Sequence, residues 1–195
     1  MTRVLLLGAV LLLSVLYPLK ASGELCRGVI RLHVIGASDS AEDQTLKLLV
    51  RDGVLKEAER LTEGCGERDE AEGRLREGMA ELTLAAERVL REKGREDTAR
   101  VSLTEEYYPL RAYDGMALPA GRYLSMRVVI GEGEGRTWWC ILYPPLCLGS
   151  SAEYSEKLTD AGISRDTAAM IVEEETERVK VRFWIVDKLM ALFGK

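Results

Sequence analysis

The spacing of apolar residues changes along the chain, and this change constrains the fold more than any other feature. From Leu46 to Leu90, apolar side chains recur every three or four residues, which is the spacing of amphipathic helices. After Gly94 the spacing falls to two, which is typical of half-buried strands. Because helices and strands fall in separate blocks, the pattern predicts an α+β fold rather than repeated βαβ units.

The helical block contains two predicted helices. The first begins at an N-cap formed either by Asp39 with Glu42 or by Ser40 with Asp43, and it ends at 62–66. The second runs from about 69 to 93, with Gly94 as a C-terminal cap. Since the link between them is short, we expect the two helices to lie antiparallel.

The strand pattern predicts a sheet and one further helical region. The clearest hairpin joins Leu124–Ile130 to Arg136–Tyr143 through the glycine-rich turn Gly131–Gly135. A short helix is predicted at 155–161, and a last strand at 179–183 leads into a final helix through Leu192. The other predicted strands are 29–35, 100–105 and 107–113. The expected fold is an antiparallel sheet with an N-terminal helical pair packed on it and a C-terminal helix.

The first 23 residues have the features of a secretory signal peptide. Arg3 precedes an apolar run from Val4 to Tyr17, and small residues follow at 21–23. The run is shorter than the roughly 20 residues that a membrane-spanning helix needs. We therefore predict cleavage near Gly23, export, and a single domain over residues 24–195; an uncleaved anchor is the alternative.

The charge of the chain limits its partners. The formal net charge is −5, and it becomes about −7 when Arg3 and Lys20 leave with the signal peptide. This acidity disfavours nucleic acid and anionic membrane surfaces as main partners.

Four cysteines are present, at 26, 65, 140 and 147, and they allow three complete pairings. An exported chain lies where disulfides persist, and a sequence separation of seven allows Cys140 and Cys147 to close a loop around Pro144–Pro145. We predict a Cys140–Cys147 disulfide. The spacings do not resemble a zinc site, and no Cys-x-x-Cys motif supports thiol chemistry, so neither metal nor cofactor is expected.

Few residues suggest catalysis. His33 is the only histidine, and no serine or cysteine lies at a recognisable motif spacing from it. The Gly131–Gly135 run resembles a phosphate-binding loop only superficially, because a strand rather than a helix follows it. We expect no catalytic residues. The alternative is an exported hydrolase or thiol enzyme that uses His33 or the Cys140/Cys147 region.

A charged segment and two tryptophans are candidate partner-binding features. Asp39, Asp43, Lys47 and Arg51 recur every four residues, so they share one helix face that is either a solvated surface or a docking surface. Trp138 and Trp139 should point to opposite faces of a strand. The candidate residues are Ser38, Asp39, Ser40, Asp43, Gln44, Lys47, Arg51, Asp52, Trp138 and Trp139.

Three stretches together resemble the stage II sporulation protein R family of endospore-forming bacteria. They are RLHVIGASDSAEDQTLKLLVRD (31–52), LPAGRYLSMRVVIGEGEG (118–135) and WWCILYPPLC (138–147), in the family's order. The family usually has Asn where this chain has Ala37.

The resemblance implies a messenger rather than an enzyme. Members are made in the forespore and exported into the space between the forespore and mother-cell membranes. There they trigger a membrane-embedded aspartic protease of the mother cell, which processes the precursor of sigma factor E. The resemblance implies no small-molecule substrate and no nucleic acid.

Overall fold

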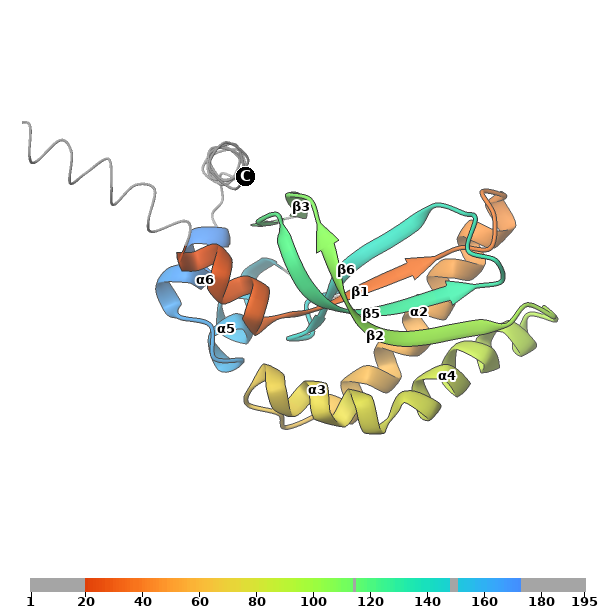
Figure 1. The fold of residues 1–195 in the computed structure, drawn as a ribbon, viewed down its shortest axis with the longest axis horizontal. Helices are drawn as coiled ribbons and strands as arrows, with labels where there is room; N and C mark the ends of the chain where they lie inside the picture. Colours follow the sequence, from red (N-terminus) through yellow and green to blue (C-terminus); the bar gives the residue numbers. More distant parts are fainter. Residues whose placement is uncertain (1–19, 114, 148–150, 173–195) are drawn as a thin grey trace, which may run out of the picture.

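A computed structural model describes residues 20–113, 115–147 and 151–172 of the 195-residue chain (Figure 1). The helices are α2 (Ala41–Thr62), α3 (Arg68–Glu77), α4 (Met79–Glu92), α5 (Ser151–Asp160) and α6 (Arg165–Ile171). The strands are β1 (Ile30–Ile35), β2 (Ala99–Tyr108), β3 (Arg111–Tyr113), β4 (Met116–Leu118), β5 (Gly121–Ile130) and β6 (Thr137–Tyr143). Residues 20–28 are also helical. The predicted α+β class is confirmed.

The main sheet has the order β2-β5-β1-β6 and is mixed rather than antiparallel. β1 pairs in parallel with β5 and antiparallel with β6, so it lies between the two strands that the sequence predicted as a hairpin. That hairpin prediction was wrong. The Gly131–Gly135 loop instead passes over the end of β1, where the Gly135 amide donates to the Gly36 carbonyl at 2.9 Å.

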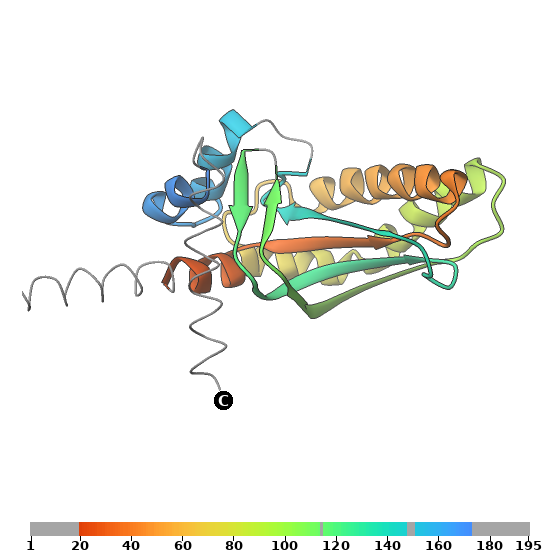
Figure 2. The ribbon, with the colours of Figure 1, turned by 90° about the horizontal axis from the view of Figure 1, so that it is seen from above.

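Helices α2, α3 and α4 cover one face of the sheet (Figures 1 and 2). Leu32 and Val34 of β1 face these helices and are fully buried with Val50 and Leu82. The second predicted helix is divided into α3 and α4 at Gly78. A Cβ atom at Gly78 would lie 2.4 Å from Leu61 Cδ1, so the close approach of α2 requires a glycine there.

A second core lies at one end of the other sheet face, where residues 20–28, α5 and α6 gather (Figure 1). Ala21 and Leu25 are buried in it, and the Glu24 carboxylate accepts hydrogen bonds from the Ser164 amide and the Thr167 hydroxyl, both at 2.5 Å. The predicted cleavage point after Gly23 therefore lies inside a packed helix. Cleavage there stays a prediction.

The hairpin of β2 and β5 bends at its tip and folds over the second sheet face (Figure 2). Tyr108 pairs with Gly121 at the end of the main sheet, and β3 then pairs with β4 as a separate two-stranded sheet. Pro109 lies at the bend, where its missing N–H does no harm to a ladder. We call the two strands β3 and β4 together the β3–β4 flap.

The remaining predicted elements have mixed outcomes. The short helix predicted at 155–161 is α5, whereas α6 and the helix at 20–28 were not predicted. The strand predicted at 179–183 and the final helix lie outside the described residues. Within the described part, no helix is long and apolar enough to cross a membrane.

Candidate functional site

The charged segment forms the start of α2, and its polar side chains bond one another. Ser40 is the N-cap, and its hydroxyl accepts from the Asp43 amide at 3.1 Å. Ser38 donates its hydroxyl hydrogen to Asp43 Oδ2 at 2.5 Å, and Gln44 donates to the Ser38 carbonyl at 2.8 Å. Of the two predicted caps, the Ser40/Asp43 cap is therefore the one formed.

Two of the four charges in this segment are buried, which contradicts a solvated helix face. Asp43 is 8% exposed and pairs with Arg95 at 2.8 Å. The hydrogen bond from Ser38, with Arg95 nearby, holds the pKa of Asp43 below its usual value despite burial. The spacing of four placed Asp43, Lys47 and Arg51 on α2, whereas Asp39 precedes the helix. The spacing did not reveal that other parts of the chain cover Asp43 and Lys47.

Lys47 is 5% exposed and ties α2 to the loop before β6. Its ammonium donates to Gln44 Oε1 at 2.6 Å and to the Arg136 carbonyl at 3.0 Å. Asp39, just before the helix, accepts from the Arg136 amide at 2.7 Å. Burial, followed by the charge of Arg136, lowers the pKa of Lys47. These residues hold the β5–β6 connection against the start of α2.

The end of the segment contacts a tryptophan. The Arg51 guanidinium lies 4.4 Å from the centre of the Trp138 ring and pairs with Asp52 at 2.7 Å. Trp138 packs on the helix side of the sheet, whereas Trp139 packs with the second core. The prediction that the two tryptophans face opposite sides is confirmed.

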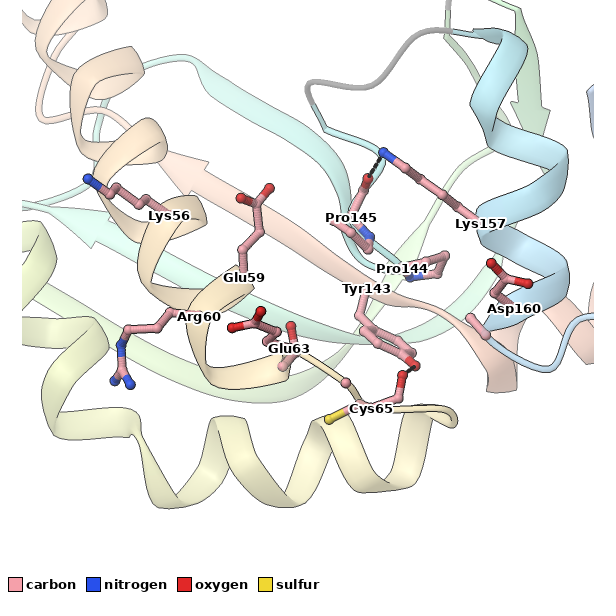
Figure 3. A pocket seen from close by; sticks show the side chains of 13 residues that line it. Lys56, Glu59, Arg60, Glu63, Cys65, Tyr143, Pro144, Pro145, Lys157 and Asp160 are labelled. Carbon is pink, nitrogen blue, oxygen red and sulfur yellow. Dashed lines mark hydrogen bonds between the residues drawn. The ribbon is translucent and has the colours of Figure 1, made fainter.

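Cys140 and Cys147 form the predicted disulfide, with their Cα atoms 5.4 Å apart. The loop that they close adjoins a pocket of about 570 Å³ between the end of α2, Pro144–Pro145 and α5 (Figure 3). At its base, Tyr143 donates its hydroxyl hydrogen to the Cys65 carbonyl at 2.9 Å. Burial raises the pKa of the Cys65 thiol, so this cysteine is a poor nucleophile at neutral pH.

The second sheet face carries a set of polar side chains that the sequence analysis did not assemble. Arg31 is fully buried among the rings of three tyrosines, at 4.2 Å from Tyr108, 5.1 Å from Tyr123 and 5.6 Å from Tyr113. We call these four residues the arginine cage. Its members come from β1, β2, β5 and β3, so no local sequence spacing could have indicated it.

His33 lies beside the cage and pairs with a carboxylate. Its Nδ1 is 3.1 Å from Glu106 Oε2, and its ring packs edge-on against Trp139 at 5.5 Å. Burial lowers the pKa of His33, and Glu106 partly opposes this effect. A histidine oriented by a carboxylate is one part of a nucleophilic site.

The other part of such a site is not assembled in the described residues. His33 Nε2 has no hydrogen-bond partner there. The nearby hydroxyls of Tyr108 and Ser125 bond each other at 2.6 Å, and both residues are buried. Nor does the described part hold a group of three or more His, Cys, Asp or Glu residues that could bind a metal ion.

The family model of Stage II sporulation protein R matches residues 27–153, which include β1 to β6 and the whole charged segment. The chain belongs to this family. It is also 28% identical over 182 residues to Stage II sporulation protein R of Bacillus subtilis (strain 168), covering 85% of this chain and 81% of the relative. No solved structure matches the chain.

Family membership confirms the resemblance read from the sequence and makes this a sporulation protein. The matched region contains the polar residues at the start of α2 and, on the second sheet face, Arg31, His33 and Glu106. The partner-binding role predicted for the charged segment and the tryptophans stays a prediction, since their geometry alone does not identify a partner.

Proposed function

We propose that this chain is an exported messenger of sporulation. It would act in the space between the forespore and mother-cell membranes. There it would trigger a membrane-embedded aspartic protease that processes the precursor of sigma factor E. The observation that carries the proposal is membership of the stage II sporulation protein R family over residues 27–153.

Two further features support export. The apolar run from Val4 to Tyr17 is that of a secretory signal peptide. The Cys140–Cys147 disulfide is a feature of proteins in oxidising compartments and is rare in the reducing cytosol. Both fit a protein that leaves the compartment where it is made.

The exposed part of the charged segment is the proposed contact with the protease. Asp39, Ser40 and Asp52 are exposed, and Arg51 with Trp138 lies beside them. Asp43 and Lys47 would contribute indirectly, by fixing the position of Asp39 and the β5–β6 connection. Complementary charges across an interface act mainly on recognition and association rate, so exposed charges at this contact would select the partner.

The proposal is tested in sporulating cells that lack their own copy of the gene. The full chain and a variant lacking residues 2–19 are expressed in the forespore, and a sigma-factor-E-dependent reporter is read in the mother cell. The deletion removes the apolar run but keeps the packed helix at 20–28. We expect only the full chain to activate the reporter. Equal activation by the variant would refute action after export.

One observation favours a second candidate, an exported hydrolase. His33 is oriented by Glu106 at 3.1 Å, as a general base would be. A His33→Gln variant that keeps its fold and its triggering activity would exclude acid–base catalysis by His33 as the source of the signal.

A further inference from the structure

Arg31 is a buried charge with no countercharge in the part of the chain that the structure describes. Its side chain is fully buried, yet it forms no ion pair with any residue in the described ranges. Its Nε donates to the Cys140 carbonyl at 3.1 Å and its Nη2 donates to the Tyr113 hydroxyl, both of which are neutral acceptors. Burying a charge is costly, and contacts with aromatic rings and neutral acceptors offset this cost only in part.

Three nitrogen atoms on this face lack hydrogen-bond partners among the described residues. They are Arg31 Nη1, His33 Nε2 and Trp139 Nε1. Arg31 and His33 are two apart on β1, and Trp139 lies opposite His33 on β6, so the three side chains project from the same face. Arg31 Nη1 and Trp139 Nε1 are donors, so together they indicate a missing acceptor. Neutral His33 directs its Nδ1–H at Glu106, and its Nε2 can therefore only accept.

The cover over these atoms is the β3–β4 flap. Tyr113 of the flap accepts the Arg31 hydrogen bond, and the Arg111 guanidinium lies 4.0 Å from the centre of the Trp139 ring. The two strands of the flap have three residues each and pair with each other, outside the main sheet. β4 is buried in the second core, whereas Arg111 and Ala112 of β3 are exposed, so Arg31 is reached by moving the β3 edge of the flap.

The charges around the flap favour an anion. Arg111 and Arg127 are exposed at its rim, and Arg31 lies beneath it. Glu106 is the acidic residue in contact with this group, and it is already engaged by His33 at 3.1 Å and Arg127 at 3.6 Å. The Nη1 and Nη2 atoms of Arg31 match the two oxygens of a carboxylate, whereas a phosphate would leave its remaining oxygens without buried donors.

We propose that the arginine cage and Trp139 bind a carboxylate of a polypeptide partner, which enters under the β3–β4 flap. The carboxylate accepts from Arg31 Nη1, replaces the Tyr113 hydroxyl at Nη2, and lies within the positive rim of Arg111 and Arg127. The partner therefore presents an aspartate, a glutamate or a chain terminus to this face. The identity of the partner rests on the proposed function, but the binding of a carboxylate by Arg31 does not.

Binding is measured by the melting temperature of the full-length protein with defined probes. The probes are acetyl-Ala-Glu-Ala-amide, its Gln counterpart, sodium acetate and inorganic phosphate, all at one ionic strength set with sodium chloride. A ligand that binds the folded protein raises its melting temperature, and the rise grows with the ratio of free ligand concentration to Kd. We expect the Glu peptide to raise it above the chloride baseline, and the Gln peptide and phosphate to have no effect. If acetate raised the melting temperature as much as the Glu peptide, a free carboxylate would suffice. That result would overturn the proposal that the carboxylate belongs to a polypeptide.

Two variants should change the affinity for the Glu peptide in opposite directions. Arg31→Met removes the charge but keeps the bulk; it should be at least as stable as the parent protein, because the buried charge is uncompensated. It should also lose the Glu-peptide effect, with affinity reduced about tenfold or more. Tyr113→Phe keeps the ring but removes the acceptor at Nη2, so the Glu peptide should bind it more tightly than it binds the parent.

These results separate this proposal from the proposed function. If no carboxylate probe shifts the melting temperature of either the parent or Tyr113→Phe, the carboxylate site is refuted, whatever the cells report. If the probe binds but Arg31→Met still activates the sigma-factor-E reporter fully, the site does not carry the signal and its role in partner binding is refuted. Loss of both binding and activation in a stable Arg31→Met protein supports the proposal.

Discussion

The role of Lys47 can be tested by replacing it with methionine, which keeps the length of the side chain and removes its charge. The ammonium donates two hydrogen bonds, to Gln44 Oε1 at 2.6 Å and to the Arg136 carbonyl at 3.0 Å. Bonds from charged donors contribute about 1.5–3 kcal/mol each, and removing a buried charge returns part of this loss. We expect the free energy of unfolding to fall by about 2 kcal/mol.

The assay is thermal and urea denaturation of the variant beside a matched control. Lys56→Met makes the same change on the same helix at an exposed position, where substitutions stay within about 0.5 kcal/mol. A loss of about 2 kcal/mol corresponds to a melting temperature lower by about 4–8 °C for a domain of this size. Equal stability of the Lys47→Met and Lys56→Met proteins would refute the bracing role of Lys47.

The stability of the Lys47 variant also decides which residues can be used to test docking of the charged segment on the protease. If Lys47 and Arg51 were a solvated face, reversing both charges would leave the melting temperature nearly unchanged. The structure predicts instead that Lys47→Glu places a carboxylate against the Arg136 carbonyl and lowers stability strongly. Exposed Asp39 and Asp52 are therefore better positions for charge reversal than Lys47.

Three further predictions concern other parts of the molecule. Peptide mapping without reductant should find Cys140 linked to Cys147, and reduction should lower the unfolding free energy by about 2–3 kcal/mol for so short a loop; free thiols at both positions in exported protein would contradict it. N-terminal sequencing of exported protein should begin near Glu24, whereas an intact chain beginning with Met1 in the membrane fraction would favour an anchor. Because burial lowers the pKa of His33, protonation favours the unfolded chain, and stability should fall as the pH drops below about 6.5. Denaturation at pH 7.5 and 5.5 should show a smaller difference for His33→Gln, and an unchanged difference would refute this coupling.

Local features of the fold were predictable because they depend on short stretches of sequence. The three- to four-residue spacing gave α2, the Ser40 cap followed from its own side chain, and the two-residue spacing gave β5 and β6. Strand pairing was not predictable in this way. β1 inserts between β5 and β6 although about ninety residues separate it from β5, and no spacing within a strand encodes its neighbour.

Among the candidate sites, those built from residues close in sequence were predictable, and those built from distant residues were not. The disulfide was predictable because Cys140 and Cys147 are close in sequence and a proline pair turns the chain between them. The burial of Lys47 depends on the carbonyl of Arg136, which is 89 residues away. The arginine cage depends on a hairpin tip that folds back over β1, so its tyrosines looked like ordinary strand residues in the sequence.

Reconstitution tests most directly whether this chain triggers a protease. The mother-cell aspartic protease and the precursor of sigma factor E are placed together in liposomes, and the purified protein is added from the side that faces the space between the membranes. We expect precursor cleavage to rise with the concentration of the protein and to saturate, and to be absent without it. Cleavage that proceeds equally with and without the protein would contradict the account.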